Sequence, residues 1–181
     1  MNDQRTHQPI AGPGPVAAYL ARRAAAYLLD VVLLAGAVLL TQGALAVLGA
    51  GLPATALGWQ VEAWVLATGS LPAWFYFIAL EHFSGATFGK RLLGLRVESA
   101  RGGRLSLGQA SLRTVLKLLP WELTHITLLL PTPIWGDPNT GLRLGLIVVY
   151  AMLGLYVAAA ALTPRRQSLP DLLSGSVVVE K

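Results

Sequence analysis

The chain has 181 residues, of which 54% are hydrophobic and 13% are charged, and its formal net charge is +5. Soluble domains usually carry about 25% charged residues, so this composition excludes an ordinary soluble domain and predicts a membrane protein. Cysteine is absent, which excludes disulfides, thiol catalysis and thiolate metal sites.

Residues 1–15 are polar and rich in glycine and proline, so we expect a flexible cytoplasmic arm before a single membrane domain over residues 16–181. The first apolar run covers about residues 16–49 and is long enough to cross a bilayer, which takes about 20 apolar residues. A cleaved signal peptide is the alternative, because Arg22 and Arg23 precede an apolar stretch and Ala44-Leu45-Ala46 resembles a small-residue cleavage site. The long leading arm and the charge of Asp30 inside the run favour an uncleaved span.

The second apolar run covers about residues 63–83, and Pro72 inside it predicts a bend. The loop that follows, residues 84–104, is strongly basic. Because cytoplasmic loops of membrane proteins carry an excess of lysine and arginine, we expect this loop and both chain termini to be cytoplasmic. The basic residues lie beside apolar runs, so they are expected to meet anionic lipid headgroups of the bilayer rather than nucleic acid.

Two short segments are typical of strands. Residues 95–98 alternate apolar and polar side chains, and residues 177–179 are three valines in a row. A lone short strand is unstable, so each segment needs a partner on the same side of the membrane. We therefore predict that residues 95–98 pair with residues 176–180 in a small cytoplasmic β cap, with Val97 opposite Val178.

The third hydrophobic region is harder to interpret. Arg113 and Lys117 lie one helical turn apart among apolar residues, which is typical of an amphipathic helix at the membrane interface. Pro120 interrupts this pattern, yet residues 107–130 together are long enough to span the bilayer. We expect a third span over residues 107–130 that is broken at Pro120, with an interfacial helix as the alternative.

The last apolar run covers about residues 142–163 and leads into a tail, residues 164–181. The sequence thus predicts an all-α membrane protein: a multi-pass, four-helix transmembrane bundle in the cell membrane with a small cytoplasmic two-stranded β cap. We find no internal repeat, so the sequence gives no support for an inverted-repeat transporter architecture.

Two charges in the first span are the main candidates for function. Arg23 and Asp30 share a helix face but lie about 10 Å apart along the axis, so each is expected to find a partner elsewhere. An aspartate inside a span costs about 2.5–3.5 kcal/mol unless it meets a cation or donor, which makes Asp30 a candidate ion or proton site. The alternative is that Asp30 fixes helix packing through a satisfied polar network. Its candidate partners are Arg113, Lys117, His82 or a hydroxyl group.

Other motifs are absent or incomplete. Residues 85–91 differ from a phosphate-binding loop, because only three residues separate the glycines and an arginine replaces the serine or threonine that would hold magnesium. His82 beside Glu81, and His125 near Glu122, show no recognised metal spacing. We interpret His82 as an interface residue, with a proton relay as the alternative. The sequence therefore predicts no enzyme, no cofactor and no metal.

Three motifs follow one another along the chain. They are Arg23 followed seven residues later by Asp30, the loop Thr87-Phe-Gly-Lys-Arg-Leu-Leu-Gly-Leu-Arg-Val97, and the tail Asp171-Leu-Leu-Ser-Gly-Ser-Val-Val-Val. Together they resemble the RDD family of small membrane proteins, which is named for one arginine and two aspartates. The resemblance covers nearly the whole chain.

The resemblance implies a polar triad and a loop motif. Phe88 stands where the family loop commonly has proline, and Pro170 stands where a histidine usually precedes the second aspartate. The triad is Arg23, Asp30 and Asp171, and the loop motif contains Thr87, Gly89, Lys90 and Gly94.

The resemblance also implies a range of functions. Transport of unknown ligands has been proposed for the family, sodium/proton antiport has been reported for some members, and a eukaryotic relative looks like a scaffold. We therefore expect a small transporter that exchanges a cation for protons at Asp30, in which a homo-oligomer encloses the route. A scaffold or accessory subunit that binds a partner protein through its basic cytoplasmic face is the alternative. In either case we expect the cap to bring Asp171 to Arg23.

Overall fold

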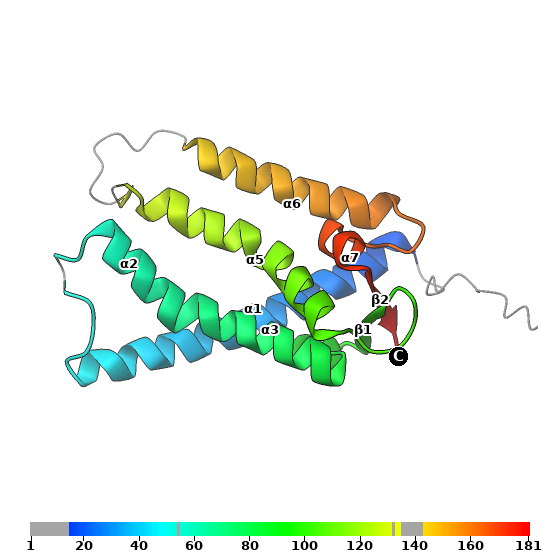
Figure 1. Ribbon diagram of the computed structural model, residues 1–181, viewed down its shortest axis with the longest axis horizontal. Helices are drawn as coiled ribbons and strands as arrows, with labels where there is room; N and C mark the ends of the chain where they lie inside the picture. The colour runs from blue at the N-terminus through cyan, green and yellow to red at the C-terminus, as the bar shows by residue number, and fades with distance from the viewer. Residues whose placement is uncertain (1–14, 54, 132, 135–142) are drawn as a thin grey trace, which may run out of the picture.

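The computed structural model describes residues 15–53, 55–131, 133–134 and 143–181, so the predicted arm lies outside the described residues except for Pro15. Long helices run side by side and a small cap lies across one end of them (Figure 1). We call this end the cap end and the opposite one the far end.

Among the described residues, three helical segments are long and apolar enough to cross a membrane. They coincide with the first, second and last predicted spans. Only 11% of the most apolar window of each segment is buried inside the protein, so their apolar side chains cover the outer surface, as in helices that face lipid. The segments are α1 (Val16–Val47), the joined helix Gly58–Ser84, and α6 (Leu144–Leu162).

The second segment is built from three pieces: α2 (Gly58–Val65), the π-helical turn η1 (Leu66–Ser70) and α3 (Leu71–Ser84). The π-helical turn ends two residues before Pro72, where the sequence predicted a bend, and such turns are one of the identifiable causes of helix kinks.

Helix α5 (Leu107–Leu129) continues through Pro120, whereas the sequence predicted a break there. Proline cannot donate a hydrogen bond to the carbonyl four residues earlier, which here belongs to Leu116. The hydroxyl of Tyr156 on α6 donates to this carbonyl at 2.6 Å. The neighbouring helix therefore satisfies the group that proline leaves free, and α5 remains continuous.

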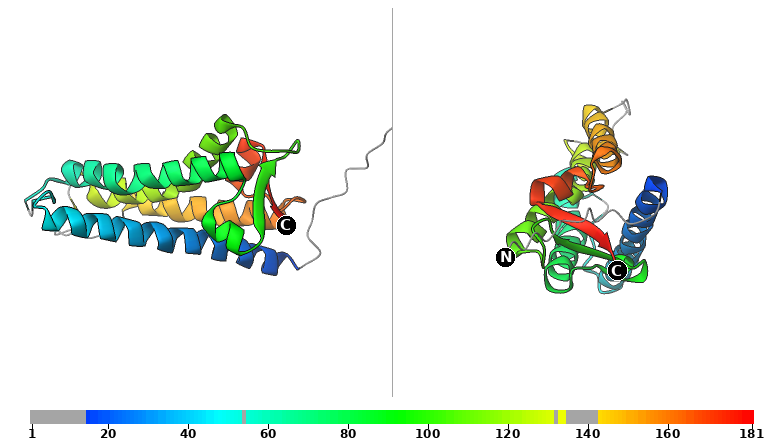
Figure 2. Two further views of the ribbon diagram at one scale, coloured as in Figure 1. Left: turned by 90° about the horizontal axis from the view of Figure 1, so that it is seen from below. Right: turned by 90° about the vertical axis from the view of Figure 1, so that its right-hand side faces the viewer.

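The cap contains the predicted sheet. Strands β1 (Leu95–Ser99) and β2 (Ser176–Glu180) are antiparallel, and Val97 lies opposite Val178 as predicted. Leu95, Val97 and Val178 form a buried cluster with Ala26 of α1, so the sheet packs against the first helix. Figure 2 shows the sheet lying across the helix ends. Two short helices complete the cap: α4 (Phe88–Leu92) and α7 (Leu169–Ser174).

Candidate functional site

Asp30 is completely buried and accepts hydrogen bonds from three neutral donors. The hydroxyls of Tyr76 and Thr87 donate to its carboxylate at 2.7 and 2.6 Å, and the backbone N–H of Gly89 donates at 2.8 Å. Of the partners that the sequence suggested for Asp30, a hydroxyl group is therefore confirmed.

The predicted cationic partners of Asp30 make other contacts. Arg113 and Lys117 bind Glu81 instead, and the Nδ1 atom of His82 lies 2.9 Å from the carbonyl oxygen of Leu105. Asp30 needs no cation because it lies at the start of α4, where unpaired N–H groups and the helix dipole stabilise a carboxylate. Side-chain charges alone could not predict this, since the donors are backbone and hydroxyl groups.

The fit of α4 against α1 depends on Gly89. A Cβ atom at this position would collide with the carbonyl oxygen of Ala26 and lie 3.2 Å from the carboxyl carbon of Asp30. Only glycine therefore lets α4 bring its N–H group to the aspartate. The N–H of Phe88 donates to the Tyr76 hydroxyl at 3.0 Å, a bond that the proline commonly found here could not make.

Glu81, near the end of α3, is a second completely buried carboxylate. Arg113 donates to both of its oxygens at 2.8 and 2.7 Å, while Lys90 and Lys117 donate at 2.9 and 3.0 Å. Lys117 also lies over the ring of Phe77, at 3.5 Å from its centre. The sequence analysis missed this role, although a carboxylate in an apolar run opposite two cations one turn apart is a detectable signal.

Asp171 of α7 is a third buried carboxylate and makes the predicted ion pair with Arg23, at 2.6 Å. Arg113 joins it at 2.7 Å, and the N–H and hydroxyl of Ser168 donate at 2.8 and 2.7 Å. Burial alone would raise the pKa of Asp171, but the guanidinium groups of Arg113 and Arg23 outweigh burial and hold this pKa well below its usual range.

These three sites form one connected network. Arg113 bridges Glu81 and Asp171, and the Lys90 ammonium, which binds Glu81, also lies 3.4 Å from the hydroxyl of Thr87 beside Asp30. With four cations and three carboxylates, its formal charge is +1. The charge network, as we name it, consists of Arg23, Asp30, Glu81, Lys90, Arg113, Lys117 and Asp171.

The loop motif implied by the resemblance divides into two roles. Thr87, Gly89 and Lys90 all contact the charge network. Gly94 instead occupies the left-handed region, with φ of +64°, where glycine is favoured. It allows the chain to turn from α4 into β1.

A cavity of about 640 Å³ lies between α1, α5 and α6, beside the charge network. Its walls are mostly apolar and include Leu20, Val149 and Leu153. All four cations of the network line this cavity, whereas none of its three carboxylates does. The cavity therefore combines apolar walls with one strongly positive region.

The sequence model of the RDD family matches residues 17–175 of the chain. This range contains the arginine and both aspartates of the triad. No match was found among curated proteins or solved structures.

Proposed function

Because the chain belongs to the RDD family of membrane proteins, we propose that it crosses the cell membrane four times and transports a small organic anion with an apolar body.

The fourth crossing follows from the strand pairing. β1 and β2 form one sheet and must lie on the same side of the membrane. Of the described elements between them, α5 and α6 are long enough to cross, whereas α7 has only six residues and belongs to the cap. If α6 crosses once, α5 must cross as well to return the chain to that side. α5 was the doubtful third span, and its charges at Arg113 and Lys117 face the buried network rather than lipid.

The orientation follows from the positive charges. The cap end carries the basic loop and a pair of arginines after α6, so by the positive-inside rule it is cytoplasmic. The start of α1 is at this end, because the Tyr19 hydroxyl donates to the carbonyl oxygen of Val178 at 2.7 Å. Both ends of the described chain are then cytoplasmic.

The lining of the cavity is the main support for an anion as the cargo. Four cations meet a mostly apolar surface, and no carboxylate of the network lines the cavity to receive a cation. A charged cleft with apolar walls attracts ions of the opposite sign. At about 640 Å³ the cavity also lies within the usual range for small-molecule sites, about 300–1,000 Å³. An amphipathic anion fits both features.

Cation/proton exchange at Asp30, and the homo-oligomer that would enclose its route, stay predictions. Asp30 is completely buried, does not line the cavity and is already held by three neutral donors. The contacts therefore give more support to an anion that binds the cationic side of the network.

Binding of an anion would act on the cap. Arg23 and Lys117 each line the cavity and each hold a buried carboxylate, Asp171 or Glu81. An anion that binds them competes with these internal contacts. It would thereby weaken the attachment of α7 to α1, which gives cargo binding a way to move the cap.

A scaffold is the second candidate, and one observation favours it. Each carboxylate of the network has at least three donors, which is an arrangement suited to a permanent lock between cap and bundle. The exposed basic face of the cap would then bind a partner protein.

Transport is tested with the purified chain in liposomes, using radiolabelled decanoate as anion and sodium with a pH-sensitive dye for cation/proton exchange. We expect decanoate uptake, reduced at least tenfold in Lys117→Gln and retained in Lys117→Arg. Lys181→Gln, which removes a lysine outside the cavity, is the matched control. Sodium-driven proton movement without decanoate uptake would support antiport, and no flux of either kind would support the scaffold.

A further inference from the structure

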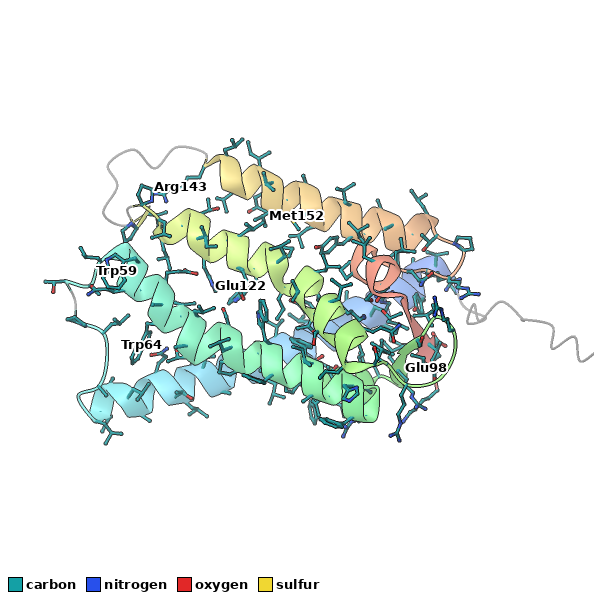
Figure 3. The ribbon with its side chains drawn as sticks, in the orientation of Figure 1. Trp59, Trp64, Glu98, Glu122, Arg143 and Met152 are labelled. Atoms are coloured by element: carbon teal, nitrogen blue, oxygen red, sulfur yellow. The ribbon has the colours of Figure 1, made fainter. Side chains whose placement is uncertain are left out.

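A second polar cluster lies between α2 and α5, away from the charge network. One ligand atom each from Glu62, Glu122 and His125 lies within 4.8 Å of the other two. Glu122 and His125 are three residues apart on α5, so they share a helix face, and Glu62 approaches this face from α2. Figure 3 shows Glu122 between these two helices.

One atom in each of two ligand groups has no hydrogen-bond partner in the part of the chain that the structure describes. The Oε2 atom of Glu62 and the Nδ1 atom of His125 are buried, and neither finds a hydrogen-bond partner within the described residues. Buried polar atoms are nearly always paired, so an unpaired oxygen and an unpaired nitrogen in one cluster need an explanation.

The third group is held in place. Ser70 and Trp74 donate to the two carboxylate oxygens of Glu122, each at 3.0 Å. The ring of His125 packs edge-on against Trp121, with 4.3 Å between the ring centres. Outer contacts of this kind orient metal ligands in proteins.

The electrostatics of the cluster also call for a cation. Two half-buried carboxylates this close together repel each other, because each disfavours the ionised form of the other. A cation between them removes this repulsion. A nitrogen of His125 in the same cluster has a lone pair that can coordinate a metal ion.

We propose that Glu62, Glu122 and His125 bind one divalent transition-metal ion, Zn²⁺ or Mn²⁺, which ties α2 to α5 in the half of the bundle away from the cap. Two oxygens and one nitrogen suit these ions better than Mg²⁺ or Ca²⁺, which prefer oxygen alone. Ligand atoms about 2.0–2.2 Å from zinc lie roughly 3–4 Å from one another, so small side-chain rotations complete the site. Glu62 comes 60 residues before Glu122, which is why linear spacing predicted no metal.

Metal binding is measured on the full chain, purified in detergent without a histidine tag, by equilibrium dialysis against Zn²⁺, Mn²⁺ and Mg²⁺. We expect one Zn²⁺ or Mn²⁺ per chain, no comparable Mg²⁺ binding, and at least tenfold weaker binding in Glu62→Gln and His125→Gln. The matched controls Glu98→Gln and His82→Gln, at the cap end, should bind as the unaltered protein does. Absence of tight binding, or equal binding by all variants, overturns the proposal.

A cysteine variant tests the site even if the glutamine variants fold poorly. Because the chain has no cysteine, His125→Cys introduces a unique thiol at the site. X-ray absorption of the zinc-loaded variant should reveal one sulfur at about 2.3 Å, where the unaltered protein has only nitrogen and oxygen ligands at about 2.0–2.2 Å. A zinc-loaded variant without a sulfur ligand would place the metal elsewhere and contradict the assignment.

Discussion

The carboxylate of Asp30 lies in the first span, yet its three partners are two hydroxyls and a backbone N–H. Each donor supplies part of the stabilisation that water would provide, so the charge is tolerated without a counter-ion nearby. Asp30 therefore holds α4 against α1, as in the packing alternative considered from the sequence. The cations gather around Glu81 and Asp171 instead.

Replacing Asp30 with asparagine should destabilise the protein. An amide has one acceptor oxygen where the carboxylate has two, and its NH₂ group would face either the Thr87 hydroxyl or the two donors on the other oxygen, Tyr76 and Gly89. We expect a loss of about 1–3 kcal/mol in the free energy of unfolding, measured by denaturation in detergent. Thr87→Val should cost less, because it removes one donor and leaves the charge. Unchanged stability in Asp30→Asn would refute the capping role.

Arg113 should be the most sensitive position in the charge network. It is buried and is the bridge between two buried carboxylates, so Arg113→Gln leaves both without their main cation. We expect a loss of about 3–5 kcal/mol. Arg22→Gln is the control: its ion pair with Glu180 is at the surface, at 3.2 Å, and should contribute less than about 1 kcal/mol. Similar losses in the two variants would argue against a buried network.

At the scale of the elements, hydrophobic pattern and β-branched content predicted the long helices and the strand pairing, but not the short helices α4 and α7. The hydrophobic pattern alone could not predict that α5 stays continuous through Pro120, because this depends on a hydrogen bond from the Tyr156 hydroxyl of α6. The sequence suggested a hydroxyl partner for Asp30 but not the backbone N–H of Gly89, because the helix that supplies this group, α4, is only five residues long. The ion pair between Arg23 and Asp171 could be predicted because the family resemblance supplied it.

Substitution of Gly89 tests whether the close contact between α4 and α1 stabilises the fold. Gly89→Ala places a methyl group against the Ala26 carbonyl and should lower the midpoint of thermal unfolding by several degrees. Gly108 is the matched control: it lies in α5, and a Cβ there meets nothing within 4 Å, so Gly108→Ala should leave the midpoint unchanged or raise it slightly. Equal midpoints for both variants would show that the close approach is unimportant.

At the scale of the whole molecule, the sheet makes the topology testable. It joins chain segments from before α5 and after α6, so α5 and α6 must both cross the membrane or neither does. The amphipathic α5 can cross because its cations are neutralised by Glu81 and Asp171 inside the bundle. The same cations line the cavity, so the contacts that permit the fourth crossing also create the proposed anion site.

The four crossings are checked by thiol labelling in cells, since the chain has no cysteine of its own. Ala50→Cys and Ile134→Cys, both exposed at the far end, should react with a reagent that cannot enter cells. Gly102→Cys, exposed in the cap, should react only after the membrane is opened. If Ile134→Cys behaves like Gly102→Cys, α5 lies at the interface and the four-span account is wrong.

The most direct measurement of the central claim is quenching of tryptophan fluorescence by a brominated decanoate, because Trp121 lines the cavity and bromine quenches only at short range. We expect saturable quenching that is lost in Trp121→Phe and that needs at least tenfold more ligand in Lys117→Gln. Quenching that persists in Trp121→Phe, or that needs the same ligand concentration in Lys117→Gln as in the unaltered protein, would argue against an anion site in this cavity.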